Sequence, residues 1–210
     1  MYNLEEGKKA VIEAGHRLLE SGLIARTWGN VSARISDTQF VITPSGRAYD
    51  TLPPDDIVVV NIDDCSYKGD IKPSSEKGIH ADAYALRSDV NFVIHTHQIS
   101  ASVIGAAGLP IDPVPKAYRD LLGETVPCAG YGMPSTDKLR NAVKKEYADN
   151  PNCKAFLMAH HGAVCLGKDF DETFEIIQAL EKACEVKLEK AFLVYEGTPE
   201  YSKKLMLNSY

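Results

Sequence analysis

The chain has 210 residues, of which 44% are hydrophobic and 25% are charged. This balance is ordinary for a globular protein and suits a single domain spanning residues 1–210. A formal net charge of −6 argues against a nucleic acid or an anionic membrane surface as the main partner, although backbone N–H groups and hydroxyls can still hold a small anion. We see no secretory signal and no apolar run that approaches membrane-spanning length.

The cysteines of the chain follow no pairing pattern. They are odd in number and include no CxxC pair: Cys65, Cys128, Cys153, Cys165 and Cys184. A disulfide framework or a thiolate zinc site would show a different spacing, so we expect reduced, buried thiols and a cytoplasmic protein.

The first half of the chain predicts one helix and three strands. Asn3 can cap the opening helix and Gly22 can end it, with apolar residues at helical spacing between them. Residues 30–35 and 39–44 are rich in β-forming side chains and flank a polar turn, which predicts a β-hairpin. Residues 55–63 predict a further strand, followed by a turn-like segment.

The second half alternates predicted helices with strands. A strand is expected over residues 91–97, and helices are expected over residues 73–89, 99–108, 134–150 and 169–197. Residues 154–167 predict either two strands broken by a tight turn at Gly162 or one bent strand. Because hairpins are too frequent for a fully parallel sheet, we expect an α/β fold with helices flanking a central, mainly antiparallel sheet.

The stretch "NFVIHTHQIS" carries two histidines at the end of a predicted strand. Successive strand side chains point to opposite faces, so His95 and His97 share a face while Thr96 points away. Two imidazoles in this arrangement can bind one metal ion, and zinc is their usual partner. The alternative is a pair of histidines on a solvated sheet face.

A second pair, His160 and His161, follows another apolar run in "LMAHHGAV". By the same alternation only one of the two can join the first pair, so a three-histidine site would use either His160 or His161. Three protein nitrogens with an open position are typical of catalytic zinc. His16 and His80 lie within helical patterns, and we interpret them as surface residues or as histidines with satisfied hydrogen bonds.

Glu76, in "KPSSEKG", is the most suggestive base for metal-assisted chemistry on a carbonyl compound. It stands in the predicted first turn of a helix, after Ser74 and Ser75. On spacing alone helix capping is the better interpretation, because acidic residues favour helix N-termini. The two serines place hydroxyls and N–H groups at a helix start, where an anion is bound well.

Two other loops combine glycine with hydroxyl or amide donors: "TWGNVS" at residues 27–32 and "TPSG" at residues 43–46. Each alone is best interpreted as a plain turn. None is a Walker loop or a Rossmann fingerprint, so no nucleotide is indicated. Together with a metal site, the loops favour a phosphorylated small molecule as the ligand.

The motifs "TWGNVSAR", "ITPSG", "KPSSE" followed by "HADAY", "VIHTH" and "HHGAVCLG" occur in the order seen in the class II aldolase/adducin family. The chain most resembles the L-fuculose-1-phosphate aldolase branch, from Glu6 to the final helix, with a looser likeness at residues 109–136 and in the last residues. The resemblance implies a single α/β domain that assembles as a homotetramer, with active sites at subunit interfaces.

The resemblance also implies roles for individual residues. The zinc ligands of the family fall on His95, His97 and, as the second histidine of "HHG", His161. The catalytic carboxylate falls on Glu76. The phosphate-binding residues fall on the three loops, at Gly29, Asn30, Ser45, Gly46, Ser74 and Ser75.

Two tyrosines of the family lie where the likeness is loose. The acid tyrosine comes from a neighbouring subunit; Tyr118 is the candidate for it, and Lys116 stands in the competing register. A further functional tyrosine lies on the C-terminal tail, where Tyr201 or Tyr210 could serve.

The implied reaction is the reversible aldol cleavage of a ketose 1-phosphate, such as L-fuculose 1-phosphate, to dihydroxyacetone phosphate and a small aldehyde through a metal-stabilised enediolate. Zn²⁺ is the expected cofactor, and Mn²⁺ or Co²⁺ also suits a site with an open position. Alternatives of the same fold are sugar-phosphate epimerases, against which Glu76 argues because they tend to carry Asp there, and methylthioribulose-1-phosphate dehydratases. Adducin-like interaction modules lack the metal histidines that this chain keeps. The sequence alone does not identify the aldehyde.

Overall fold

The computed structural model describes residues 1–24 and 28–196 of the chain. The helices are α1 (Leu4–Glu20), α2 (Lys77–Leu86), α3 (Ile99–Ala106), α4 (Arg119–Leu122), α5 (Asp137–Asp149) and α6 (Phe170–Glu196). The strands are β1 (Gly29–Arg34), β2 (Gln39–Ile42), β3 (Val58–Asn61), β4 (Phe92–Thr96), β5 (Cys128–Ala129), β6 (Ala155–Met158) and β7 (Ala163–Gly167). Short 3-10 turns lie at Tyr49–Thr51, Pro54–Asp56 and Lys116–Tyr118.

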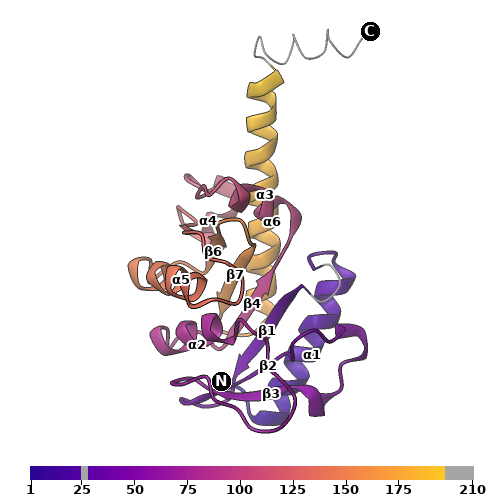
Figure 1. The fold of residues 1–210 in the computed structure, drawn as a ribbon. Coiled ribbons are helices and arrows are strands. Elements are labelled where there is room, and N and C mark those ends of the chain that lie inside the picture. The colour runs from indigo at the N-terminus through magenta and orange to yellow at the C-terminus, as the bar shows by residue number, and fades with distance from the viewer. Residues whose placement is uncertain (25–27, 197–210) are drawn as a thin grey trace.

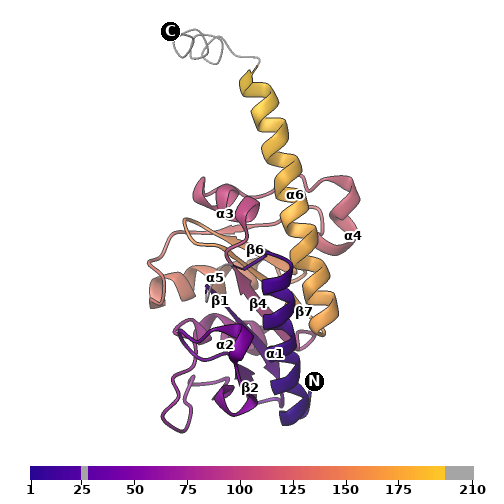
Figure 2. The same ribbon diagram turned by 90° about the vertical axis from the view of Figure 1, so that its right-hand side faces the viewer.

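The strands form one sheet in the order β3-β2-β1-β4-β7-β6-β5. All neighbouring pairs are antiparallel except β5 and β6, which are parallel at one edge. Helices α1, α3, α4 and α6 pack against one face, and α2 and α5 pack against the other (Figure 1). Figure 2 shows α1 and α6 together on their side of the sheet, with the C-terminal part of α6 extending beyond the other elements. The predicted α/β fold with a mainly antiparallel sheet is confirmed.

Local sequence signals account for most element boundaries. Asn3 caps α1 in a capping box, because its side chain accepts from the Glu6 N–H and the Glu6 side chain accepts from the Asn3 N–H. The helix ends before Gly22, whose φ of 69° is in the left-handed region. The short elements α4 and β5 were not predicted. None of the described helices is long and apolar enough to cross a membrane.

Strand β4 separates two apolar cores. Phe92 and Ile94 pack on the side of α1 and α6, whereas Val93 packs on the side of α2 and α5. This is the alternation expected for a central strand, and His95 continues the face of Val93. The last residues of β4 therefore bring a histidine to the edge of the core beneath α2.

A tight turn joins β6 to β7, so the two-strand interpretation of residues 154–167 is correct. The Met158 N–H donates to the Gly162 carbonyl at 2.8 Å, and the His161 N–H donates to the Met158 carbonyl at 3.1 Å. A Cβ at Gly162 would lie 2.4 Å from the Thr96 carbonyl oxygen and 3.1 Å from Cε1 of His95. Glycine therefore allows this turn to approach the end of β4.

We expect Gly162→Ala to lower the free energy of unfolding by about 1 to 3 kcal/mol, because the added methyl group meets backbone atoms that cannot rotate away. Gly130→Ala is the matched control, since a Cβ there meets nothing within 4 Å. Denaturant unfolding of both variants measures the difference. Equal stability of the two variants would contradict the close approach of this turn to β4.

Candidate functional site

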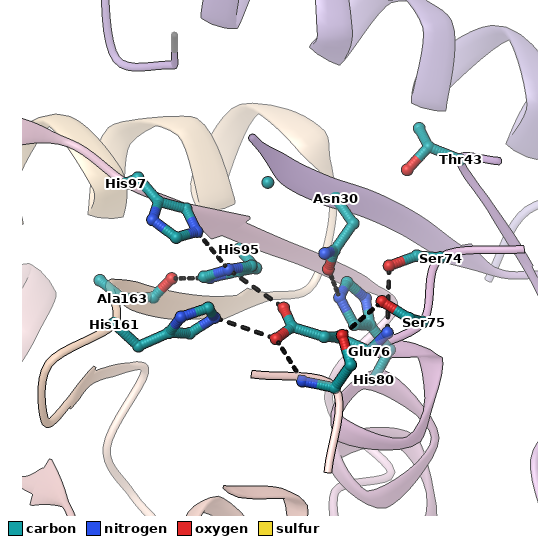
Figure 3. A network of polar contacts seen from close by, with 12 residues as sticks. Asn30, Thr43, Ser74, Ser75, Glu76, His80, His95, His97, His161 and Ala163 are labelled. Atoms are coloured by element: carbon teal, nitrogen blue, oxygen red, sulfur yellow. Dashed lines mark hydrogen bonds and ion pairs between the residues drawn. The ribbon is translucent and has the colours of Figure 1, made fainter. Parts of the chain in front are cut away.

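Three histidines meet at the end of the sheet. His95 and His97 come from the end of β4, and His161 comes from the turn between β6 and β7. One side-chain nitrogen of each lies within 4.8 Å of the others, and the ring centroids are 4.7 to 4.8 Å apart. Figure 3 shows the three rings grouped on one side of the Glu76 carboxylate, with contacts drawn from its oxygens to His95 and His161. The structure thus brings together the three histidines that the motifs singled out.

His160 points away from this cluster. Its φ of 56° lies in the left-handed region, its side chain is exposed, and its ring packs edge-on against Tyr131. This reversal of the backbone turns His161, and not His160, towards β4.

The histidine nitrogens are arranged as metal ligands. Nδ1–H of His95 donates to the Ala163 carbonyl at 2.8 Å, so Nε2 of the neutral ring carries a lone pair. That lone pair faces Nε2 of His97 at 3.0 Å and Oε2 of Glu76 at 3.2 Å. Nε2 of His161 lies 3.0 Å from Oε1 of Glu76 but has no hydrogen-bond partner among the described residues. The ligand nitrogens of the three histidines all lie within 4.8 Å of one another, so these residues could hold a metal ion.

Burial and mutual proximity set the charge of these groups. Loss of hydration lowers the pKa of His95 and brings the pKa of His97 to about 3, so both rings are neutral, which is the form that binds a metal. Burial by itself would raise the pKa of Glu76, but the contacts with His161 and His95 outweigh it and hold the pKa well below its usual range. The buried carboxyl group is therefore ionised.

Glu76 does not cap α2, and this corrects the interpretation that its spacing favoured. It directly precedes the helix, and its side chain makes no capping hydrogen bond. The hydroxyl of Ser74 accepts the Glu76 N–H at 3.2 Å instead. The carboxylate turns to the histidines, and its Oε1 also accepts the Ser135 N–H at 3.3 Å. The carboxylate thus faces the histidine cluster and not the N–H groups of its own helix.

Two of the three loops that carry the expected phosphate-binding residues, at residues 43–46 and 72–75, lie side by side. Both are joined to β1. The Thr43 carbonyl accepts the Ser74 N–H at 3.0 Å, and the Lys72 carbonyl accepts the Ser45 N–H at 2.9 Å. The Thr43 hydroxyl accepts the Val31 N–H at 3.2 Å, which ties this pair of loops to the strand that begins at the third loop. These hydrogen bonds therefore join the three loops to one another.

The expected phosphate-binding residues lie in different settings within these loops. The tip at residues 45–46 is exposed, and Ser75 is exposed with its hydroxyl 2.7 Å from that of Ser135. Gly29 has a φ of 123°, and a Cβ there would lie 2.5 Å from the His95 carbonyl oxygen. Glycine at this position lets the first loop lie against β4.

Asn30 lies directly opposite His95 in the pairing of β1 with β4 and is buried. Its side-chain oxygen contacts Nε2 of His80, and Nδ1 of His80 lies 2.6 Å from the Ser32 hydroxyl. His80 is completely buried with both ring nitrogens satisfied, so it is not a surface residue. The polar site thus continues beneath α2.

Tyr118 does not reach this cluster within one chain. It ends the 3-10 turn Lys116–Tyr118 and packs against the core on the side of α6. Its expected role therefore depends on a neighbouring subunit, as the resemblance implies. Tyr201 and Tyr210 lie outside the described residues, as does Thr27 of the first loop.

Two residues of the site escaped sequence reasoning. Ser135 lies 59 positions after Glu76, and nothing in its local sequence indicates that contact. His80 follows Glu76 by four residues, which places both on one side of a helix, and this spacing could have indicated it.

An ionised carboxylate beside three histidines that could hold a metal ion, on this α/β fold, is compatible with a metal-dependent class II aldolase. The chain belongs to the Class II Aldolase and Adducin N-terminal domain family, which it matches over residues 9–188. The expected family and the expected class of enzyme, a lyase, are confirmed.

Curated relatives and solved structures agree with this assignment. The chain is 29% identical over 184 residues to a 5-deoxy-D-ribulose 1-phosphate aldolase from Bacillus thuringiensis, covering 87% of this chain and 84% of the relative. It is 30% identical over 190 residues to a methylthioribulose-1-phosphate dehydratase from Hahella chejuensis, covering 85% and 91%. An L-fuculose 1-phosphate aldolase structure superposes with a TM-score of 0.79 at 26% identity, covering 96% of this chain and 94% of that chain.

We expect the free energy of unfolding to fall as the pH is lowered, because burial lowers the pKa of His80 from 6.5 to about 3. Between pH 6.5 and pH 3 His80 binds a proton in the unfolded chain but stays neutral in the folded chain. Its contribution to the free energy of unfolding is therefore complete above pH 6.5 and is lost towards pH 3. The slope from this group is at most about 1.4 kcal/mol per pH unit.

Urea unfolding of the metal-free protein at several pH values measures this slope. His80→Gln removes the titrating group and should flatten the curve relative to the wild type. The same slope in both proteins would contradict the burial of a neutral His80.

Proposed function

We propose that this protein is a zinc-dependent aldolase that reversibly cleaves a ketose 1-phosphate to dihydroxyacetone phosphate and a small aldehyde. The observation that carries the proposal is the position of Glu76, whose ionised carboxylate lies 3.0 Å from His161 and 3.2 Å from His95. A base beside a metal centre suits the removal and return of a proton next to a carbonyl group.

His95, His97 and His161 would hold the zinc ion through neutral imidazoles. When bound, zinc supplies Lewis-acid chemistry that lowers the energy of negative charge on the substrate oxygens. The hydrogen bond from Nδ1 of His95 to Ala163 supports this role, because it keeps Nε2 unprotonated and orients the ring.

Glu76 would move the proton at C3 of the dihydroxyacetone phosphate portion. The Ser135 N–H donates to Oε1 of Glu76 at 3.3 Å and so restrains the carboxylate. Because Glu76 is only 8% exposed, its proton is exchanged with bound substrate more readily than with bulk water.

The substrate phosphate would bind at residues 29–30, 45–46 and 74–75. Backbone N–H groups, hydroxyls and an amide would hold it, which is compatible with a chain of net charge −6. Fixing the phosphate also fixes the distance between C3 of the substrate and Glu76, which is a large part of catalysis by orientation.

The relatives support a ketose 1-phosphate as the substrate class. One is named for 5-deoxy-D-ribulose 1-phosphate, whose cleavage between C3 and C4 would give dihydroxyacetone phosphate and acetaldehyde. Another is named for L-fuculose 1-phosphate. Both compounds carry the phosphate, carbonyl and hydroxyl groups that the proposed mechanism uses.

We expect His95→Ala to lose bound zinc and cleavage together, and Glu76→Gln to keep zinc while the turnover number falls by about 100- to 10,000-fold. Metal analysis and a coupled assay for dihydroxyacetone phosphate measure the two properties. His160→Ala is the matched control, because that exposed histidine points away from the cluster. Full activity after removal of the metal by a chelator would rule the mechanism out.

A methylthioribulose-1-phosphate dehydratase is the second candidate, favoured by the 30% identity to the relative from Hahella chejuensis. A dehydratase would also use a base and a metal beside the carbonyl of a ketose 1-phosphate. It would eliminate water and keep the carbon chain intact, so its product differs from that of an aldolase.

We expect the zinc-loaded protein to join dihydroxyacetone phosphate to acetaldehyde or lactaldehyde, forming a new ketose 1-phosphate. Mass spectrometry of the mixture identifies the product. Given methylthioribulose 1-phosphate, the protein should release dihydroxyacetone phosphate. Loss of one water from that compound, with no addition product from any aldehyde, would favour the dehydratase.

We also propose that the enzyme works in the cytoplasm as a homotetramer whose active sites lie between subunits, each completed by Tyr118 of a neighbour. The position of Tyr118 on the α6 side, away from the histidines of its own chain, supports a contribution in trans.

Subunit mixing tests this arrangement. Glu76→Gln and Tyr118→Phe should each be nearly inactive alone, whereas refolding them together should restore about a quarter of the sites if each site takes Glu76 and Tyr118 from different chains. Mixed proteins that stay inactive would contradict the contribution in trans.

A further inference from the structure

Helix α2 presents polar side chains to the sheet at intervals of four residues. Glu76, just before the helix, faces the histidine cluster, and His80 and Tyr84 follow on the same side at the next two turns. His80 is 0% exposed and Tyr84 is 2% exposed. Their partners, Asn30 and Ser32, alternate along one face of β1. A buried polar line therefore runs from the core to the candidate active site.

Along this line each group donates a hydrogen bond to the next, from Tyr84 through Ser32 and His80 to Asn30. Oδ1 of Asn30 can only accept, so the proton of the neutral His80 ring lies on Nε2, the nitrogen that contacts it. Nδ1 of His80 is then an acceptor, and the Ser32 hydroxyl at 2.6 Å donates to it. Ser32 in turn accepts from the Tyr84 hydroxyl at 2.7 Å. Tyr84 is therefore the first donor in this series of hydrogen bonds, a position that suits it because a phenol is a stronger acid than a serine hydroxyl.

The line ends beside the metal histidines. Asn30 is the register partner of His95, so their side chains share a face with Cβ atoms about 5 Å apart. Figure 3 draws Asn30 between the histidine cluster and Ser74. Because Oδ1 of Asn30 is held by His80, the amide N–H groups point elsewhere and can donate into the site. The reversed carboxamide would present an oxygen and repel an anion.

We propose that His80 is a positioning residue that locks the Asn30 carboxamide with its N–H groups towards the anionic group of the substrate, and that Ser32 and Tyr84 fix the His80 tautomer that does so. The inference rests on the proposed phosphate-binding role of Asn30. A histidine that served packing alone would need no particular tautomer, because a rotated carboxamide satisfies the other tautomer equally well.

A double-mutant cycle tests whether His80 acts through Asn30. Calorimetric titration of the zinc-loaded protein with dihydroxyacetone phosphate should show that His80→Phe raises Kd by about 10- to 100-fold, the value of one hydrogen bond to a charged group. Asn30→Ala should raise Kd by a similar factor, and the double variant should bind no more weakly than Asn30→Ala alone. Equal losses in both backgrounds, or loss of bound zinc from His80→Phe, would overturn the inference.

Milder variants keep the test valid if His80→Phe does not fold. Ser32→Ala and Tyr84→Phe each remove one hydroxyl from the line, so both should raise Kd for dihydroxyacetone phosphate with zinc unchanged, and both effects should vanish in the Asn30→Ala background. His16→Phe, on α1 away from this line, should leave Kd unchanged. An effect of Ser32→Ala that persists without Asn30 would overturn the inference.

The His80 tautomer separates this inference from the proposed function. Nitrogen NMR of labelled wild-type protein should show the His80 proton on Nε2, and a proton on Nδ1 would overturn the inference. If the wild type bound no dihydroxyacetone phosphate and cleaved no ketose 1-phosphate, the proposed function would fail, and the tautomer would still decide the orientation of Asn30.

Discussion

The pairing of β4 with β1 on one side and β7 on the other is the constraint on which the candidate site depends. It places His95 opposite Asn30 in one neighbour and opposite Val164 in the other. The ring of His95 is held in turn by the Ala163 carbonyl of β7. The orientation of this imidazole is therefore set by backbone atoms of a paired sheet, which hold a reactive geometry more rigidly than loops do.

Helix α2 completes the site on one face of the sheet. The same placement of the helix buries its apolar side and directs its polar side chains to the site. Ile79 and Ala83 bury its apolar side in the core, while Glu76 and His80 face the polar end of β4 and β1. A buried carboxylate needs hydrogen-bond donors to offset its loss of hydration, and the Ser135 N–H supplies one to Glu76 at 3.3 Å. Removing the helix from this position would leave both the carboxylate and the histidines without their counterparts.

The family relationship indicates the class of enzyme, but it does not identify the substrate. Relatives at similar identity are named as an aldolase and as a dehydratase, so overall likeness does not separate the two reactions. Both names contain a ketose 1-phosphate. The two reactions divide at the bond that breaks after the proton has moved, which depends on groups around the aldehyde portion.

The local parts of this protein were open to prediction because they depend on neighbours in sequence. The alternation of side chains along residues 91–97 predicted that His95 and His97 share one face of the sheet, and the capping residue Asn3 predicted the start of α1. The same local reasoning failed at Glu76, where capping was favoured, and it left His80 open between a surface position and a satisfied one, of which the structure shows the second. In both cases the competing partner came from a strand or a loop far along the chain.

The sequence by itself determined the family, the chemistry of the side chains and the face on which the first histidine pair lies. Alternation left His160 and His161 open, and only the left-handed backbone at His160 decided that His161 turns towards β4. Only the packing of α2 on the sheet decided that the Glu76 carboxylate meets the histidines and that His80 supports Asn30. Periodicity is a property of neighbouring residues, whereas these contacts join segments that approach each other only when the layers pack.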